Sequence, residues 1–413
     1  MPFLPCLLAL CAAGALALGA AATPLLVRDG LVTLPLAGRL NVTGSQNVLA
    51  RDRARAKALR TRSADAQAEY RPGGGDFPLS DFVTAYTADV LIGTPPTSYT
   101  LLVDTGSANT WVGAGKPYVK TRSSVDTGET VFILYGSGAL FGEEFMDTVK
   151  IGPLTIYNQS IGVAEETFGF PEGIDGILGI GPVDLTAGTV SGGGTVSTVL
   201  DNAVAQGLFR DEIVGISFEP STCEGTSTDG ELTFGGIDPR RFIGRLDFVP
   251  ITSTSPASLY VGIDQSITYG FKGRTILSSA SGIVDTGTTL ILIPSDAFAE
   301  YQQATGGTVD SVTGLLKITK EQYACLESLF FHIGENTYEF TPNAQIWPRA
   351  LNSGIGGDAD SIYLVVADAG DASGSGFEFV NGFTFLQRFY HVFDVAGKRA
   401  GFASTKFTHA VTN

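Results

Sequence analysis

Two copies of one short motif carry the residues whose chemistry stands out in this chain. An apolar run ends on residues 104–107 (Asp-Thr-Gly-Ser), and another ends on residues 285–288 (Asp-Thr-Gly-Thr). Such a run predicts a buried strand and the glycine allows a tight turn, so we expect each aspartate on a loop that follows a core strand. The copies begin 181 positions apart (285 − 104), a spacing typical of two similar lobes rather than of a short repeat.

Two aspartates that face each other could hydrolyse an amide bond. Carboxylates a few ångströms apart cannot both ionise freely, so the pKa of one rises, the pKa of the other falls, and the pair shares one proton. Asp104 and Asp285 could then divide the work, since one takes a proton from a water molecule while the other donates a proton to the carbonyl oxygen. In such a site the loop glycines admit backbone N–H groups, and the hydroxyls bind the carboxylates or join the two loops. The residues with these supporting roles are Thr105, Gly106, Ser107, Thr286, Gly287 and Thr288.

Further segments resemble those of a known family and follow in the same order. The chain resembles the pepsin-family (A1) aspartic endopeptidases from about residue 82 to residue 407. The matching segments are 104–111 (first active-site motif), 134–138 (flap), 175–179 (the segment that crosses behind the first loop) and 389–394 (final strand pair). The resemblance implies an all-β, bilobal fold with the active-site cleft between two similar β-lobes. It also implies catalytic Asp104 and Asp285, an extended peptide substrate, inhibition by pepstatin-like compounds, and no metal or organic cofactor.

The flap segment gives an expectation about substrate preference. Residues 131–135 predict a strand that enters a turn of small residues, and such a hairpin can close over a bound peptide. The resemblance implies that Trp111 packs near the flap and that its N–H reaches the flap tyrosine. Some fungal members of the family carry aspartate at the position of Ser137 and accept lysine at the cleaved bond, so the uncharged serine predicts a preference for bulky apolar residues. The expected flap residues are Tyr135, Gly136, Ser137 and Gly138.

Composition and charge agree with an all-β protein that works in acid. The chain has 413 residues, 52 of them glycine and only 16% charged, and its short apolar runs alternate with glycine-rich turns. Residues 1–75 hold nine basic and four acidic groups, so residues 76–413 hold 17 (26 − 9) basic and 38 (42 − 4) acidic groups. A net charge of −21 (17 − 38) on this body disfavours nucleic acid and anionic membranes as partners. Adaptation to an acidic medium and the ordinary acidity of secreted proteins explain the charge equally well.

The N-terminal region predicts a secreted precursor. Residues 1–20 are apolar with small residues at their end, which indicates a signal peptide rather than a membrane anchor. Residues 21–75 are interpreted as a basic prosegment whose alanine- and leucine-rich part favours a helix. We expect its lysines or arginines to cover Asp104 and Asp285 until acid releases them; a disordered basic linker is the alternative. The N-terminal lobe would then be residues 76–220, the C-terminal lobe residues 221–413, and the protein a monomer.

Several single residues carry open expectations. Cys223 and Cys325 could form a disulfide in a secreted chain, or they could be two buried thiols. Asn158 lies in an Asn-x-Ser glycosylation signal. Asn381 stands where the family usually has an apolar residue, so the local packing depends on whether it finds partners.

Three other functions are less well supported. A pepsin-like protein that has lost catalysis could bind or inhibit another protein, but such proteins usually lose one aspartate motif, and both are whole here. A serine or zinc hydrolase is disfavoured because the chain has three histidines and neither Gly-x-Ser-x-Gly nor His-Glu-x-x-His. A β-sandwich adhesion or carbohydrate-binding module would leave the repeated aspartate motif unexplained.

Overall fold

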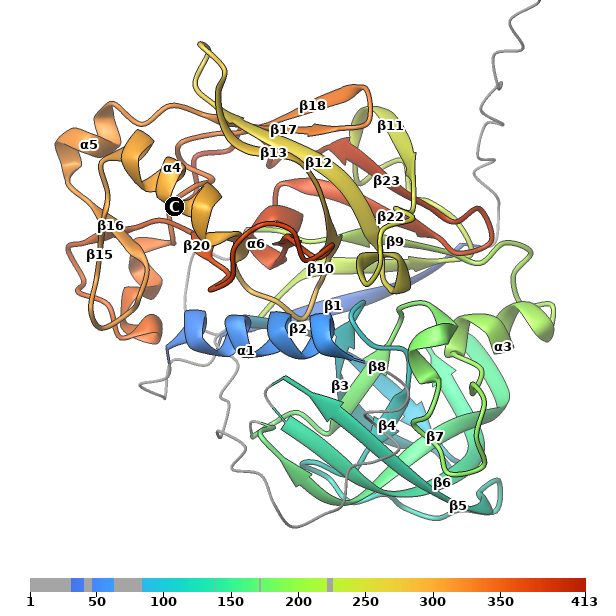
Figure 1. Ribbon diagram of the computed structural model, residues 1–413. Coiled ribbons are helices and arrows are strands. Elements are labelled where there is room, and N and C mark those ends of the chain that lie inside the picture. Colours follow the sequence, from blue (N-terminus) through green and yellow to red (C-terminus); the bar gives the residue numbers. More distant parts are fainter. Residues whose placement is uncertain (1–30, 41–46, 63–83, 137, 171, 221–225) are drawn as a thin grey trace, which may run out of the picture.

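The computed structural model describes residues 31–40, 47–62, 84–136, 138–170, 172–220 and 226–413. Within these residues strands dominate and form three sheets, while helices are few. Figure 1 shows two bodies of strands with one helix, α1 (Val48–Thr61), lying between them. The all-β, bilobal fold expected from the sequence is confirmed. The predicted signal peptide lies outside the described residues, and no described helix is long and apolar enough to cross a membrane.

The largest sheet has 13 strands and runs through both lobes. Its order is β11-β23-β22-β9-β10-β1-β2-β3-β8-β4-β7-β6-β5. These strands are β1 (Val32–Leu40), β2 (Thr84–Ile92), β3 (Thr97–Asp104), β4 (Thr110–Val112), β5 (Val125–Tyr135), β6 (Gly138–Ile151), β7 (Leu154–Phe168), β8 (Gly176–Gly179), β9 (Ile213–Ser217), β10 (Thr226–Phe234), β11 (Ile243–Pro250), β22 (Phe389–Asp394) and β23 (Arg399–Ser404).

A seven-stranded sheet and a three-stranded sheet complete the second lobe. Their orders are β18-β17-β12-β13-β21-β14-β20 and β15-β16-β19. The strands are β12 (Gly262–Tyr269), β13 (Arg274–Val284), β14 (Ile291–Ile293), β15 (Thr308–Val309), β16 (Leu316–Ile318), β17 (Leu329–Ile333), β18 (Asn336–Phe340), β19 (Ile362–Tyr363), β20 (Val366–Asp368) and β21 (Phe379–Asn381). The remaining helices are α3 (Val199–Ala205), α4 (Ser295–Thr305), α5 (Lys320–Ala324) and α6 (Phe383–Leu386), with 3-10 turns η1 (Val183–Thr186), η2 (Ala257–Leu259) and η3 (Arg349–Ile355).

One three-strand arrangement occurs in each lobe and ends at an aspartate. In the first lobe β3 pairs in parallel with β8, and β8 pairs antiparallel with β4. In the second lobe β13 pairs in parallel with β21, and β21 pairs antiparallel with β14. Asp104 is the last residue of β3, and Asp285 directly follows β13. The repetition therefore places the two aspartate loops at equivalent points of the two lobes.

The strands before the aspartates are fully enclosed, as their apolar runs predicted. Leu101, Leu102 and Val103 are at most 1% exposed, and so are Ile283 and Val284. A strand that is buried on both faces has a continuous apolar run instead of an alternating one. Such strands give the aspartates rigid supports.

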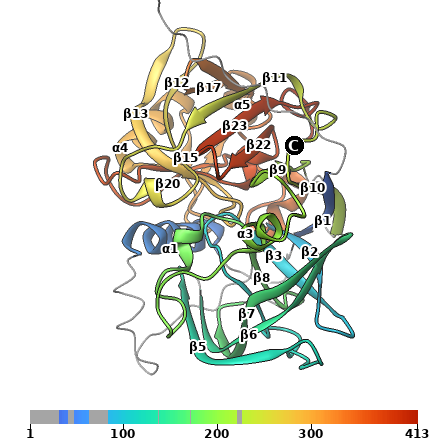
Figure 2. The same cartoon turned by 90° about the vertical axis from the view of Figure 1, so that its right-hand side faces the viewer.

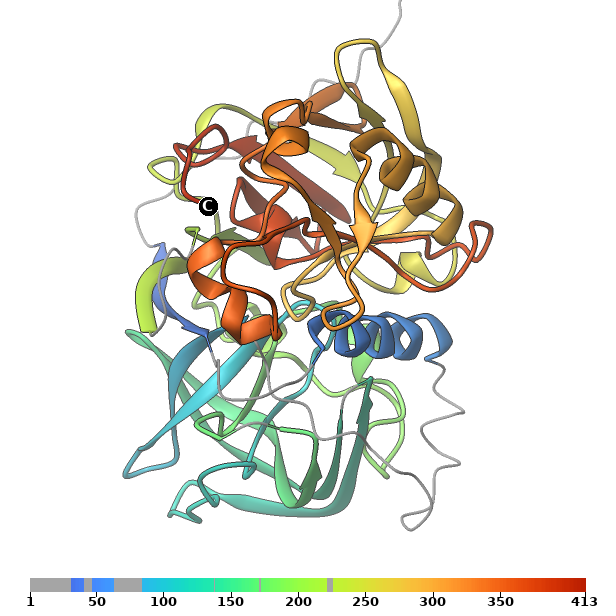
Figure 3. The same ribbon diagram turned by 90° about the vertical axis from the view of Figure 1, so that its left-hand side faces the viewer.

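Helix α1 confirms the helical tendency of the basic segment. It begins after Asn47, whose side chain accepts a hydrogen bond from the N–H of Ala50 and so caps the first turn. Its buried apolar residues include Leu49 and Leu59, which pack into the main core. Figures 2 and 3 show α1 from two further sides, with β5 and β6 on one side of it and strands of the second lobe on the other.

Strand β1 was not predicted from the sequence. It is inserted in the large sheet between β10 and β2, antiparallel to both. Val32, Leu34 and Leu36 are buried and alternate with less buried neighbours, which is the period-2 pattern of a strand. Pro35 weakens that signal, because proline is uncommon within a paired strand.

Candidate active site

The two aspartate loops are joined by a symmetric set of threonine hydrogen bonds. The N–H of Thr105 donates to the hydroxyl of Thr286 at 3.0 Å, and the N–H of Thr286 donates to the hydroxyl of Thr105 at 3.0 Å. Each hydroxyl then donates to a carbonyl of the opposite lobe: Thr105 to Val284 at 3.2 Å, and Thr286 to Val103 at 3.0 Å. Because both hydroxyls donate as well as accept, the loops are fixed relative to each other.

Each carboxylate is oriented by its own loop in the same way. Ser107 Oγ donates to Asp104 Oδ2 at 2.6 Å, and the N–H of Gly106 donates to Oδ1 at 3.0 Å. The equivalent hydroxyl and N–H of the second loop donate to Asp285 at 2.5 and 3.2 Å. These donors favour the ionised carboxylates and fix their orientation. The second-loop donors are Thr288 and Gly287.

The glycines allow each loop to approach the carboxylate of the other. A β-carbon on Gly106 would lie 2.7 Å from Asp285 Oδ1, and one on Gly287 would lie 2.8 Å from Asp104 Oδ1. Both distances are shorter than real contacts of a β-carbon, so a side chain at either position would push the loops apart. The structure therefore brings the two aspartates into one buried site.

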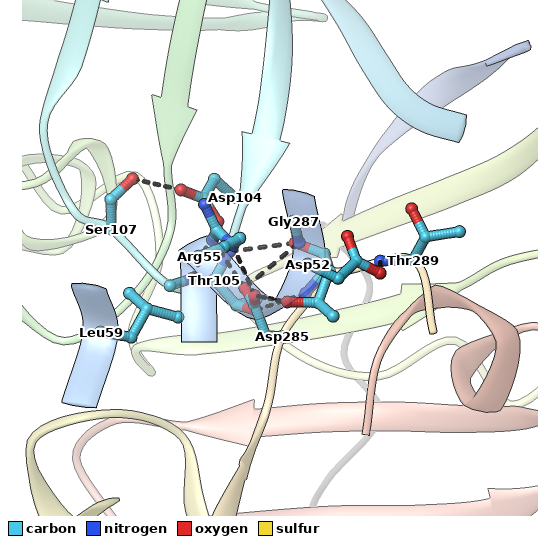
Figure 4. Close-up of polar contacts among 12 residues, drawn as sticks. Asp52, Arg55, Leu59, Asp104, Thr105, Ser107, Asp285, Gly287 and Thr289 are labelled. Atoms are coloured by element: carbon cyan, nitrogen blue, oxygen red, sulfur yellow. Dashed lines mark hydrogen bonds and ion pairs between the residues drawn. The ribbon is translucent and has the colours of Figure 1, made fainter. Parts of the chain in front are cut away.

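Arg55 of α1 occupies the space between the two carboxylates (Figure 4). Its Nη2 donates to Asp104 Oδ1 at 2.5 Å and to Asp285 Oδ1 at 2.9 Å, while its Nε donates to Asp285 Oδ2 at 2.7 Å. One nitrogen thus bonds both aspartates, so their nearest oxygens can be no further apart than two hydrogen-bond lengths. The side chain of Arg55 is 5% exposed, and both carboxylates are fully buried.

Burial and charge shift the pKa values of these groups in different directions. Burial raises the pKa of Asp104, with a further contribution from Asp285, although Arg55 opposes the shift. Burial also acts to raise the pKa of Asp285, but Arg55 and the loop donors outweigh it and hold that pKa below its usual value. For Arg55, burial favours the neutral form, but the two carboxylates prevail and raise its pKa. The two aspartates are therefore unequal, as a pair that shares one proton requires.

A second buried acid of α1 anchors the helix to the second aspartate loop. Asp52 Oδ2 accepts the N–H groups of Thr289 and Leu290 at 2.9 and 2.8 Å. Arg51 Nη2 donates to Asp52 Oδ1 at 2.9 Å and to the hydroxyl of Thr289 at 2.7 Å. Burial raises the pKa of Asp52 despite these donors. Asp52 was not predicted from the sequence, where its one distinctive feature is that it is an acid within a run of arginines.

The flap hairpin β5–β6 lies against the same helix. Trp111 Nε1 donates to the hydroxyl of Tyr135 at 2.8 Å, and both rings contact Phe170 edge to face. Burial and then the charge of Asp104 raise the pKa of Tyr135. A β-carbon on Gly136 would collide with the Cα of Arg55, so the turn after β5 packs directly on the helix backbone. Ser137 lies outside the described residues, and Gly138 begins β6.

Other contacts hold α1 along the second lobe. Arg53 binds Asp368, and Arg60 binds Asp371 and lies over the ring of Phe377. The hydroxyl of Tyr260 donates to the carbonyl of Leu59 near the end of α1 at 2.7 Å. The sequence indicated basic residues over the aspartates but did not identify Arg55 among them, nor the acids of the second lobe that bind the other arginines.

Two further candidate residues, Asn158 and Cys325, take no part in the hydrogen bonds and ion pairs given above. Asn158 is exposed beside β7 residue Tyr157, which is 60% exposed. Cys325 is exposed, and Cys223 lies outside the described residues, so their pairing stays a prediction.

Comparison with known proteins gives one consistent family. A sequence model described as eukaryotic aspartyl protease matches residues 85–405. The chain is 55% identical to polyporopepsin of Irpex lacteus over 341 residues, which cover 82% of this chain and 99% of that protein. It is 31% identical to cathepsin E of Aquarana catesbeiana over 81% of this chain and 83% of that protein. The crystal structure of the aspartic proteinase from Irpex lacteus superposes with a TM-score of 0.79 at 48% identity, covering 93% of this chain and all of that one.

Proposed function

The chain belongs to the eukaryotic aspartyl protease family and is an aspartic endopeptidase, and on this basis we propose that Asp104 and Asp285 are its catalytic pair. One observation carries the assignment: two buried carboxylates with equivalent supports share a single cationic partner. A group that bonds both carboxylates at once marks the place where a water molecule and a peptide carbonyl would be bound. The aspartates of both repeated motifs thus act as one unit.

The hydrolytic step follows from the geometry of this pair. With Arg55 removed, a water molecule held between the carboxylates gives a proton to one of them and attacks the peptide carbonyl carbon. The proton already held by the pair passes to the carbonyl oxygen, and the tetrahedral intermediate then breaks its C–N bond as the amine takes up a proton. The loop donors on both aspartates keep the carboxylates oriented throughout these steps. A closing flap with Tyr135 would cover an extended peptide and exclude bulk water.

The protein acts, in this proposal, as a secreted zymogen whose prosegment contains α1. Arg55 blocks the catalytic pair, and its bond to Asp285 requires the ionised carboxylate. Because the pKa of Asp285 is lowered while Arg55 is bound, the stabilisation is present at neutral pH and is lost as the pH falls through that lowered pKa. Acid also protonates the carboxylates of the acidic body, residues 76–413, which attracts the basic segment.

Two further parts of the proposal rest on the sequence. The apolar N-terminal stretch supports secretion, and the uncharged Ser137 supports a preference for apolar residues at the cleaved bond.

Acid proteolysis tests this function against the alternative of an inactive binding protein. Purified secreted protein is incubated at about pH 4 with denatured haemoglobin, with and without pepstatin. We expect shortening of the chain from its N-terminus and release of peptides, both blocked by the inhibitor. An intact chain that binds haemoglobin or pepstatin but releases no peptides would support the binding protein instead.

A further inference from the structure

Asp368 forms a preorganised carboxylate at the edge of the second lobe. It is the last residue of β20, which pairs in parallel with β14 next to the second aspartate loop. Its Oδ1 accepts the hydroxyl of Ser295 at 2.6 Å and the N–H of Gly370 at 2.8 Å. Two donors on one oxygen fix the orientation of the group, so its second oxygen has a defined direction.

The free edge of Asp368 holds one guanidinium through two parallel hydrogen bonds. Arg53 Nη2 donates to Asp368 Oδ2 at 2.7 Å, and Arg53 Nε donates to the main-chain carbonyl of Asp368 at 2.6 Å. This pattern matches the planar fork of arginine and is not one that a lysine ammonium can reproduce. The residue thus presents two acceptors of its own, a carboxylate and a carbonyl, to one flat cation.

The site lies along the same helix as the catalytic pair. Arg53 and Arg55 are two positions apart on α1, so they differ by only about 3 Å along the helix axis but project to different sides of it, Arg53 to β20 and Arg55 to the two aspartates. The chain also links the two sites, because β14 follows the second aspartate loop and ends two residues before Ser295, which orients Asp368. Both sites are covered by the same helix and would be uncovered together.

We propose that Asp368 is a specificity residue that binds an arginine side chain of the peptide substrate once α1 has left. The proposal rests on the proposed function, since it assigns a substrate contact to the same site. Arg53 occupies the position that a substrate arginine takes in the open enzyme, within a few residues of the cleaved bond. The favoured substrate then combines an apolar residue at the cleaved bond with an arginine at one neighbouring position.

Asp371 provides a matched control on the same loop. It binds Arg60 of α1, and its side chain is 54% exposed, against 22% for Asp368, while Arg60 is 15% and Arg53 38% exposed. Asp368 differs in its preorganisation, because two donors fix its carboxylate and its main-chain carbonyl supplies a second acceptor to the same guanidinium. We therefore assign arginine recognition to Asp368 and not to Asp371.

A peptide series measures the effect. The parent peptide has Phe or Leu at the cleaved bond, and each position from four before to four after that bond carries either arginine or citrulline, its neutral isostere. The acid-processed enzyme should cleave the arginine peptide with a kcat/KM roughly five- to tenfold higher than the citrulline peptide at one position, and lysine should restore less than half of that gain. Equal rates at every position, while the parent peptide is cleaved, would overturn the subsite and leave the protease assignment intact. Failure to cleave any peptide would instead reject the proposed function.

Two variants assign the preference to a residue. Asp368→Asn should reduce the ratio of kcat/KM for the arginine peptide to that for the citrulline peptide to about one. The asparagine would place an NH2 group where Asp368 Oδ2 accepts a hydrogen bond, and this NH2 group repels the donors of the guanidinium. Asp371→Asn should keep at least half of the wild-type ratio. Because each ratio compares two peptides cleaved by the same enzyme, a general loss of folding or activity in a variant cancels. A ratio that survives in Asp368→Asn, or that is lost in Asp371→Asn alone, contradicts the assignment.

Discussion

Arg55 illustrates how one side chain can occupy the space between the two aspartates that we propose as the catalytic pair. Its guanidinium and both aspartates are buried, and isolated buried charges are costly. The three hydrogen bonds compensate for that burial only while all three groups stay together. Removing the arginine leaves two adjacent carboxylates, which then keep a proton between them.

Asparagine at either of the two proposed catalytic positions should abolish activity. We expect Asp104→Asn and Asp285→Asn each to lower peptide hydrolysis at about pH 4 by more than about 1,000-fold, because the pair acts as a unit. Neither variant should shorten itself in acid. Circular dichroism spectra matching the wild type would show that the fold is kept, and appreciable hydrolysis by either variant would remove that residue from the mechanism.

His391 sets part of the acid stability of the molecule. It lies fully buried on β22, its Nδ1 contacts the carbonyl of Gly401 at 3.2 Å, and no described residue bonds its Nε2. Burial lowers its pKa to about 4, so the unfolded chain takes up a proton before the folded one does. The neutral His391 therefore contributes fully to the free energy of unfolding above about pH 6.5, and this contribution falls by about 3 kcal/mol as the pH drops to 4.

A histidine-to-phenylalanine change tests this pH dependence. In an Asp285→Asn background, which prevents self-digestion, urea unfolding of His391→Phe should lose about 3 kcal/mol less between pH 7.5 and pH 4 than the His391 parent. The comparison uses the change with pH, so any constant effect of the substitution cancels. Equal losses in both proteins would show that His391 titrates normally.

At the scale of elements, the sequence predicted the duplicated strands and a basic helix over the aspartates, but it did not predict strand β1. Continuous apolar runs before both aspartates predicted β3 and β13, because enclosed strands need apolar residues on both faces. Helix α1 followed from its alanine, leucine and arginine content. Strand β1 was missed because Pro35 interrupts its alternating pattern, and its pairing with β10 depends on residues almost 200 positions away.

The positive charge of Arg55 should set the pH at which the proposed precursor shortens. The Arg55→Gln variant should process itself at a pH about one unit higher than the wild type, because the two aspartates lose the partner that holds the helix. Lys57→Gln removes the same charge from an exposed position of α1 and should leave the midpoint unchanged. Gel analysis after incubation across pH 3 to 7 gives both midpoints. Coinciding midpoints would mean that Arg55 does not hold the prosegment.

A buried amide pair replaces the apolar contact usual behind the second aspartate loop. Asn381 Nδ2 donates to Gln265 Oε1 at 2.8 Å, and Gln265 Nε2 donates to Asn381 Oδ1 at 3.2 Å. Asn381 is fully buried and Gln265 is 2% exposed. The two amides satisfy each other, which explains how an asparagine is accommodated at this position.

A double-mutant cycle measures that pairing. Asn381→Leu alone should lower the free energy of unfolding by about 2–3 kcal/mol, because Gln265 is left buried without its partner. Adding Gln265→Leu should recover more than about 1 kcal/mol of this loss. Strictly additive losses in urea unfolding at pH 6 would show that the two amides do not stabilise each other.

For the whole molecule, the sequence indicated what repeats, what is apolar and which polar groups meet at the aspartate loops and the flap, but it did not indicate the polar contacts between α1 and the second lobe. The two aspartate motifs could be paired because they are identical in pattern. Asp52 and Asp368 could not be identified, since a single acid has no periodicity and its partners are far away in the chain. Opposite net charges on residues 1–75 and 76–413 did indicate that the two parts attract each other.

Titration of the acid-processed enzyme with pepstatin tests the central claim most directly. If Asp104 and Asp285 form one catalytic unit, hydrolysis of an apolar peptide at about pH 4 falls linearly and reaches zero at one inhibitor per chain. Activity that persists at a large excess of pepstatin, or that needs two equivalents to disappear, would contradict a single site built from both aspartates.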